Sequence, residues 1–489
     1  MKQKFLKYLL YILVLNIPIK LIYVLVIDVA VQNLTGSLSY GLYFPVLNLC
    51  LIFQVILDFG LNNFVRREVA RHRDMISKYF ISILITKIFL GIVYFIIITS
   101  LAGFFEYTAS SYHIIVMVII NQIFAELILF VRSNLGALYQ FKHESIISVM
   151  DRLLMIIVCG SVLLILPLKN NFKIEWFIYC QTLSYIITLV FAITLLLKND
   201  IKFGFKLYLK EYFAIIKTTI PYAILFLLMG IYYRIDPLLI KKLADNGQFQ
   251  AGIYAHSFRL LDMLQNYGYL FSIILLPMFS RMLKEKYQVD ELVNTAFLLL
   301  IIPAIIICSF SAFQSQQIIS FLYKEDIVFS SKIFTVLISG FLFISTSYVF
   351  GTLLTANGNF KDLIFIAFIG VVINISLNFF LVPTMGALGA AYTSLIVQCV
   401  TSILQFILAI RKINIKINRN NIIRIAIFFI FAYVFAFLTK NLFSIFIIAF
   451  FVFAAGILVM LFILKIIDKK NFEFLLKYIS GEKQKSPSV

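Results

Sequence analysis

The sequence has little charge, little cysteine and none of the familiar catalytic motifs. Only 13% of its 489 residues are charged, whereas an ordinary soluble domain carries roughly 25%. The five cysteines lie in apolar segments without metal-ligand spacing, and we interpret them as small apolar side chains: Cys50, Cys159, Cys180, Cys308 and Cys399. The four histidines are scattered and show no H-E-x-x-H spacing: His72, His113, His143 and His256. We therefore expect no metal site and no cofactor.

These absences also exclude most enzyme classes. The chain has no phosphate-binding loop of the G-x-x-x-x-G-K-S/T type. A transferase or polymerase acting on a membrane lipid would need a long outer loop with carboxylates or histidines for acid and base catalysis, and the outer connectors are short. The net charge of +19 comes from Lys and Arg in short connectors beside apolar runs, where they face lipid headgroups. We expect neither an enzyme nor a nucleic-acid-binding protein.

Long apolar runs are what the sequence has instead. Hydrophobic residues make up 62% of the chain, and runs of about twenty residues, each long enough to cross ~30 Å of hydrocarbon, recur along its length. The first run, Leu9–Val31, follows three lysines but is too long for a cleavable signal peptide. We expect an all-α, polytopic protein with about fourteen transmembrane helices, over residues 9–31, 39–60, 79–104, 112–137, 146–168, 174–197, 218–240, 252–277, 292–313, 332–354, 363–382, 387–409, 423–439 and 442–466.

Alternate connectors differ strongly in positive charge. One set, which includes both termini, holds thirty Lys and Arg residues, and the other set holds seven. Because positive charge is retained on the cytoplasmic side of a membrane, this alternation predicts that both termini are cytoplasmic. It also supports the helix count, since a missed helix would scramble the alternation.

The helices are expected to form two pseudo-symmetric six-helix lobes, residues 1–197 and 218–410. Residues 198–217 join them, either as an amphipathic segment on the cytoplasmic interface or as a plain basic loop. Two further helices, 411–467, and a cytoplasmic tail, 468–489, follow. The Gly-x-Tyr at positions 41–43 recurs at 252–254, six helices later, as in parallel repeats that bind substrate between them.

Ionisable residues inside apolar spans are functional candidates, because a charge in hydrocarbon is costly unless it is paired or faces water. Lys20, Arg234 and Arg259 are expected to converge on a polar cavity and bind an anionic group such as a diphosphate. Pro18 and Pro221 can open their helices towards this cavity. Structural pairing or snorkelling is the alternative role for the three cations.

The acidic residues in these spans allow two interpretations. Asp28, Glu126, Asp236 and Asp262 either exchange H⁺ or Na⁺ during a transport cycle or neutralise nearby cations. Arg259 and Asp262 have the three-residue spacing of an ion pair on one helical face. Nearer the cytoplasmic surface, pairing accounts for a further set: Asp58, Lys87 and Arg132.

Several motifs resemble the oligosaccharide flippase family, within the superfamily of multidrug, oligosaccharidyl-lipid and polysaccharide exporters. They extend over nearly the whole chain: Gly41–Tyr43, Asp58–Leu61, Arg67–Ala70, Arg234–Pro237, Ala251–Tyr254, Phe258–Leu261, Asn378–Pro383 and Gly386–Ala391. The resemblance implies two lobes facing each other in a V, a cationic central cavity lined by helices 1, 2, 7 and 8, and alternating access. It agrees with Lys20, Arg234 and Arg259 as the cavity cations.

The resemblance also implies the substrate and its setting. The expected substrate is an undecaprenyl-diphosphate-linked sugar unit, carried from the cytoplasmic to the periplasmic leaflet of a bacterial inner membrane. Expected partners are this lipid-linked oligosaccharide, membrane lipids, and a polysaccharide polymerase with its chain-length machinery, around a monomeric transporter. Helix 1 offers one cation where lipid II flippases tend to carry more, which favours an O-antigen, capsule or exopolysaccharide unit over lipid II. A multidrug/cation antiporter of the same superfamily is the other alternative.

Overall fold

The structure, a computed structural model, describes residues 16–464 apart from residues 17, 72–74, 106, 108–110, 166–170, 199–208, 417 and 444. Over these residues the chain is almost entirely helical. The first half contains η1 (Tyr23–Asp28, a π-helical turn), α2 (Val29–Ile52), η2 (Phe53–Leu57), α3 (Leu61–Arg71), α4 (Met75–Phe104), α5 (Tyr112–Ala137), α6 (Phe141–Leu164) and α8 (Ile174–Leu197).

The second half continues with longer helices and one short one. They are α9 (Leu209–Arg234), α10 (Asp236–Leu243), α11 (Gly247–Lys284), α12 (Asp290–Leu322), α13 (Ile327–Ser339), α14 (Phe341–Ala356), α15 (Phe360–Met385), α16 (Ala387–Ile413), α17 (Arg419–Leu442) and α18 (Phe446–Ile463). The expected tail, residues 468–489, and the start of the first expected helix lie outside the described residues. So does half of the expected linker, residues 199–208, and its last residues, from Leu209 on, begin α9.

The helix boundaries differ from expectation at three places, each with a local cause. The first two expected helices follow each other without a loop in the stretch Pro18–Leu57, and the non-helical backbone of Gly36, where φ is +74°, separates them at a kink. The seventh breaks at Ile235, and α9 and α10 meet at 46° because Pro237 lies in the first turn of α10 and donates no backbone hydrogen bond. The basic connector after the second helix contains a short helix, α3, that the apolar pattern did not predict.

Eleven helices of the described chain are long and apolar enough to cross a membrane, or twelve if α9 and α10 form one bent span. This is fewer than the fourteen expected. The stretch Pro18–Leu57 counts once, although its 40 residues would extend ~60 Å at ~1.5 Å per residue, twice the thickness of the hydrocarbon. Helix α11 is not counted, because Arg259, Asp262 and several neutral polar residues make it less apolar.

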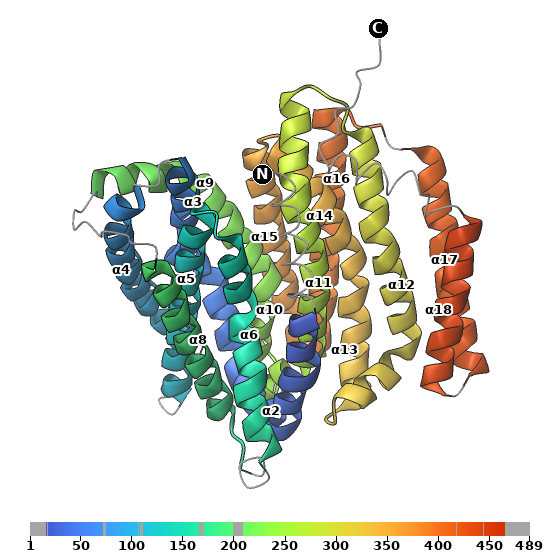
Figure 1. Cartoon of the computed structure of the whole chain (residues 1–489). Coiled ribbons are helices and arrows are strands. Elements are labelled where there is room, and N and C mark those ends of the chain that lie inside the picture. Colours follow the sequence, from blue (N-terminus) through green and yellow to red (C-terminus); the bar gives the residue numbers. More distant parts are fainter. Residues whose placement is uncertain are drawn as a thin grey trace.

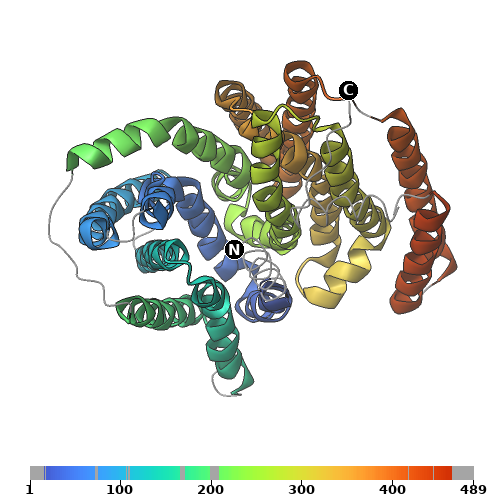
Figure 2. The same ribbon diagram turned by 45° about the horizontal axis from the view of Figure 1, so that its top comes forward.

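The helices form two groups with a pair of helices at one side (Figure 1). Helices α4, α5, α6 and α8 pack together beside α2, whereas α11–α16 form the second group, against which α10 and the end of α9 pack. Helix α9 begins over the first group and runs into the second (Figure 2). Helices α17 and α18 pack on each other and on α12. The lobe boundaries at residues 197, 218 and 410 stay a prediction.

Gly41 and Gly252 bring α2 and α11 into direct backbone contact. A Cβ atom on Gly41 would lie 1.8 Å from the carbonyl oxygen of Gln248, and one on Gly252 would lie 2.0 Å from that of Ser37. The two contacts are reciprocal, since each glycine meets the carbonyl four residues before the other glycine. The Gly-x-Tyr motif that suggested a repeat therefore lies at the contact between the two groups of helices, where only glycine fits.

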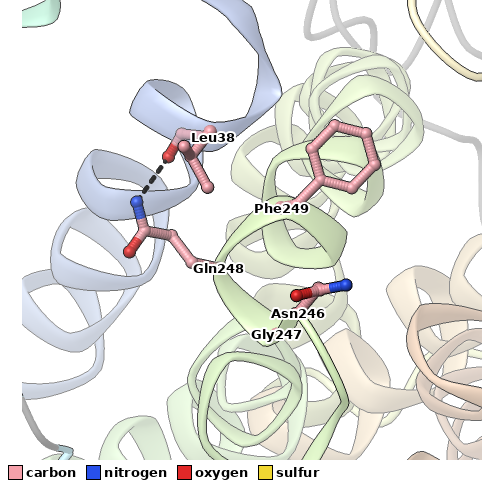
Figure 3. Close-up of a pocket in the computed structure, with 5 residues that line it drawn as sticks. All are labelled: Leu38, Asn246, Gly247, Gln248 and Phe249. Carbon is pink, nitrogen blue, oxygen red and sulfur yellow. Dashed lines mark hydrogen bonds between the residues drawn. The ribbon is translucent and has the colours of Figure 1, made fainter.

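Polar contacts extend this glycine contact into what we call the helix seam, formed by residues 33–41, 248–252 and 322–325. The bend at Gly36 frees the N–H of Ser37, which donates to Glu325 Oε2 at 2.7 Å. Gln248 Nε2 donates to the carbonyl oxygen of Leu38 at 2.8 Å (Figure 3). A pocket of about 290 Å³ lies beside this bond, lined by Leu38 and residues 246–249, and none of the predicted site residues lines it.

The seam predicts a strong asymmetry between two glycine substitutions. Gly252→Ala forces a methyl group against a carbonyl oxygen and should lower the stability of the purified protein by about 1–3 kcal/mol or more. Gly103→Ala, in α4 with nothing within 4 Å of the new Cβ, should be neutral or slightly stabilising. Thermal unfolding in detergent measures both, and equal melting temperatures for the two variants would contradict the seam.

Candidate functional site

One face of α11 gathers the predicted cations. Arg259, Asp262 and Asn266 follow a spacing of three and four residues, which aligns their side chains along one helical stripe. Each of the three makes a polar contact with a different position on another helix. The stripe therefore connects α11 with the first helix and with α9.

Arg259 pairs with Asp28 of the first helix. Its Nε donates to Asp28 Oδ2 at 3.0 Å and its Nη2 to Oδ1 at 2.8 Å, a bidentate arrangement. Tyr40 and Gln32 also donate to the Asp28 carboxylate, at 2.9 and 2.8 Å. Asp28 is fully buried, and four donors together satisfy its two oxygens.

Arg234 pairs with Asp262. Its Nη1 and Nη2 donate to the two carboxylate oxygens at 3.2 Å each, and Nη1 also reaches Asn48 Oδ1 at 3.3 Å. Both side chains are about one-fifth exposed. The expected pairing of Arg259 with Asp262 along α11 is thus not formed, because each residue has a bidentate partner on a neighbouring helix.

Lys20 of the first helix contacts the last residue of the stripe, Asn266. Its Nζ donates to Asn266 Oδ1 at 3.1 Å, and Asn266 in turn donates to the carbonyl oxygen of Asp262. One turn earlier, Asn16 donates to Ser148 of α6 at 3.1 Å, which holds this end of the first helix against α6. Asn266 thus connects Lys20 with the residue that pairs with Arg234. Lys20 also lies within electrostatic reach of Arg152, Asp151 and Arg132.

The three residues expected near the cytoplasmic surface do not form one cluster. Lys87 Nζ lies 2.9 Å from Asp58 Oδ1 and 2.8 Å from Glu126 Oε1. Arg132 lies elsewhere on α5, within electrostatic reach of Glu144 and of the Asp151 and Arg152 pair. Within the described ranges no group of three His, Cys, Asp or Glu side chains could hold a metal ion.

Asp236 is the acidic candidate without a cation beside it. It is fully buried, and its carboxylate accepts from Tyr254 at 3.0 Å and from Asn374 and Asn378 at 2.9 Å each. Among the residues that the structure describes, no Lys or Arg pairs with it. The side-chain oxygens of Asn378 and of the nearby helix residue Thr393 are buried without a hydrogen-bond partner.

The prediction missed the neutral polar residues that complete these sites. Asn266, Asn374 and Asn378 each hydrogen-bond an ionisable side chain of another helix, and Asn62 does the same with Glu126. A buried amide in an apolar span costs free energy unless it is hydrogen-bonded. Asparagine inside a predicted span was therefore the signal that could have found them.

The Arg259–Asp28 pair generates a stability prediction. Asp28→Asn leaves a buried guanidinium without its counter-charge and should cost about 3–5 kcal/mol, whereas the double variant Asp28→Asn with Arg259→Gln should recover most of this loss. Glu285→Gln removes the ion pair between Arg281 and Glu285 at the end of α11, in which Arg281 is 59% exposed. This substitution should lower stability by less than about 1 kcal/mol. Thermal unfolding of the purified variants measures each change, and a double variant as unstable as Asp28→Asn would contradict this account.

Comparisons with known proteins agree with this architecture. The family model described as "Polysaccharide biosynthesis protein" matches residues 5–283. No curated protein matches the chain. Among solved structures, the lipid II flippase MurJ in an inward closed conformation has a TM-score of 0.64 at 15% identity, over 87% of this chain and 96% of that one.

Two further structures belong to the same superfamily. An inward-facing multidrug resistance MATE family transporter of the MOP superfamily has a TM-score of 0.61 at 15% identity, over 81% of this chain and 94% of that one. A MOP superfamily transporter from Pyrococcus furiosus has a TM-score of 0.58 at 14% identity, over 84% and 96%. The fold of this chain is therefore the one that these membrane transporters share. Because the family model matches more than half of the chain, this protein belongs to the polysaccharide biosynthesis protein family.

Proposed function

We propose that the protein is a flippase that carries undecaprenyl-diphosphate-linked oligosaccharides from the cytoplasmic to the periplasmic leaflet of a bacterial inner membrane. The substrate would supply a unit of O-antigen, capsule or exopolysaccharide. The transporter works by alternating access as a monomer and passes the unit to a polymerase with its chain-length machinery. Family membership supports the pathway, and the cations on the α11 stripe support the chemical class of the substrate.

Fourteen crossings fit this proposal. The 40-residue stretch Pro18–Leu57 is long enough to cross the membrane twice. Helix α11, with 38 residues, can form one further crossing, and the bent pair α9 and α10 can form another. Together with the ten other spans they give two six-helix lobes and two additional helices. The excess of positive charge in alternate connectors supports cytoplasmic termini.

The gathering of Lys20, Arg234 and Arg259 is the single observation that carries the proposal. Arg259 uses Nε and Nη2 for Asp28, so its Nη1 donors remain for another acceptor, since a guanidinium has five N–H groups. Among the described residues, Lys20 donates its hydrogen bond to a neutral partner, Asn266, and interacts with Arg152, Asp151 and Arg132 at longer range. A diphosphate can therefore bind Lys20 directly and reach the spare donors of the paired arginines without breaking either ion pair.

The cationic character of this site separates the proposal from its alternatives. A multidrug/cation antiporter needs acidic and aromatic groups facing its substrate, and here Asp262 of the stripe and Asp28 of the first helix are already paired with arginines. A lipid II flippase shares the fold. The described part of the first helix carries one cation, Lys20, whereas the resemblance implies more cations there in a lipid II flippase, and this difference favours another lipid-linked sugar. Drug-resistance assays and flipping of labelled lipid II test these alternatives directly.

Lys20→Gln provides the main test of the proposal. Replacing Lys20 removes a charge whose protein partner is neutral, so the protein should fold normally while export of surface polysaccharide falls roughly ten- to a hundredfold, as expected for one charge-assisted bond of about 1.5–3 kcal/mol. Complementation of a deletion strain, with the folded protein quantified by gel filtration, measures the effect.

Lys412→Gln serves as the matched control, because Lys412 is half exposed at the end of α16. The neutralised pairs Arg259→Gln with Asp28→Asn and Arg234→Gln with Asp262→Asn extend the test without stranding a charge. Normal export in all three site variants would refute the proposal.

Among the four acidic candidates, the geometry favours Asp236 for ion coupling. Asp28 and Asp262 each pair with an arginine and Glu126 with a lysine, whereas Asp236 accepts hydrogen bonds only from neutral donors among the residues that the structure describes. An isolated carboxylate in a membrane protein is expected to take up a proton or a metal cation. We therefore assign to Asp236 the exchange of a monovalent cation, H⁺ or Na⁺.

This assignment predicts a selective loss of coupling. Asp236→Asn should leave flipping of a labelled sugar lipid in proteoliposomes measurable but remove its stimulation by an imposed H⁺ or Na⁺ gradient. Asp245→Asn, at an exposed position before α11, should behave like the wild type. Undiminished stimulation in Asp236→Asn would exclude this carboxylate as the coupling site.

A further inference from the structure

A second group of ionisable residues lies away from the α11 stripe, inside the first group of helices. Lys87 of α4 is 1% exposed and lies between Asp58 Oδ1, at 2.9 Å, and Glu126 Oε1 of α5, at 2.8 Å. The surrounding side chains form a buried apolar cluster that includes Leu90 and Phe130. This group is therefore a charged node in a medium of low dielectric constant.

The node contains one more acid than it has bases. Lys87 uses its three N–H groups on Asp58, Glu126 and the carbonyl oxygen of Leu57, so the ammonium has no donor left. Among the described residues, Lys87, Asp58 and Asn62 are the side chains that interact with Glu126, and of these only Lys87 is cationic. If both acids were ionised, Lys87 could neutralise only one of them. Asp58 is 24% exposed and can keep its charge facing water, whereas an uncompensated charge on Glu126, which is 5% exposed, would be costly.

The amide of Asn62 points to the way in which this charge is removed. Its Nδ2 donates to Glu126 Oε1 at 2.7 Å, while its Oδ1 is buried without a partner. A carboxylic acid and a primary amide pair through two bonds, one from the amide N–H and one from the acid O–H to the amide oxygen. If the Asn62 amide were rotated by 180°, its Oδ1 would lie 2.7 Å from Glu126 Oε1. Two oxygens at this distance also require a proton between them.

We propose that Glu126 carries a proton in this conformation and shares it with Asn62, which makes this node a proton-binding site of the transporter. The protonated Oε2–H donates to Asn62 Oδ1, and Lys87 then neutralises Asp58 alone. Every buried polar atom named above has a partner in this arrangement. The site lies on α3, α4 and α5, apart from Asp236 and apart from the cations on the α11 stripe.

The node is connected to the contact between the two groups of helices. Asp58 begins the turn before α3, and the next residue, Phe59, accepts a hydrogen bond from Thr219 of α9 at 2.7 Å. When Glu126 releases its proton to water, its carboxylate competes with Asp58 for Lys87. Proton release thus loosens the turn that holds α9. As far as it concerns transport, this consequence rests on the proposed flippase function.

Infrared spectroscopy of the full chain in lipid nanodiscs tests the proton directly. At neutral pH the wild type should show a protonated-carboxyl C=O band that Glu126→Gln removes. Glu144→Gln is the matched control, because Glu144 pairs with the half-exposed Arg66 at 2.8 Å, and it should leave the band unchanged. Asn62→Leu should shift the band, since the acid O–H loses its acceptor. A spectrum identical in the wild type and Glu126→Gln would overturn the proposal.

The link to transport has its own readout. Glu126→Gln retains the amide pairing with Asn62, so it should fold. It should flip labelled sugar lipid in proteoliposomes with a rate that varies less with pH between about 5 and 8 than that of the wild type, because the Asp236 site remains intact. A pH profile equal to that of the wild type would overturn the coupling. A wild type that flips no sugar lipid would contradict the proposed function instead, while the infrared result would still decide the proton site.

Discussion

The pairing of Arg259 with Asp28 is the interaction on which the rest of this structure depends. Inside a membrane a guanidinium needs both a counter-charge and hydrogen-bond acceptors, and Asp28 supplies them from the first helix. This pair fixes the first helix against α11 and sets the level at which Lys20 meets Asn266. The residue spacing along α11 forms the stripe, and this contact helps to determine which part of the first helix faces it.

Two different kinds of contact follow along α11. At its beginning, Gly252 allows the backbones of α11 and α2 to touch, and this contact excludes side chains and leaves little space. Further along, Arg259, Asp262 and Asn266 hold the neighbouring helices through polar groups that are in part exposed. The glycine contact at one level of α11 and the paired charges at the next level thus separate a closed seam from a region where polar side chains remain partly exposed.

The acids within the helices are distinguished by their partners and not by their sequence context. Asp28 and Asp262 serve to orient arginines, Asp236 is met by amides and a hydroxyl group, and Glu126 shares a single lysine with Asp58. The same residue type therefore has three different electrostatic environments in one protein. Each environment suits a different role: positioning a cation, exchanging an ion, or holding a proton.

The sequence by itself determined the solvent, the fold class and the short set of residues worth examining, because hydrophobic length and intramembrane charge are properties of the chain read locally. It also singled out the Gly-x-Tyr repeat. Only the tertiary structure decided that Arg259 pairs with Asp28 and not with Asp262 three residues away, and that asparagines far apart in the sequence complete the sites. Partner choice depends on which helices pack together, and long-range packing leaves no periodic signal in the amino-acid pattern.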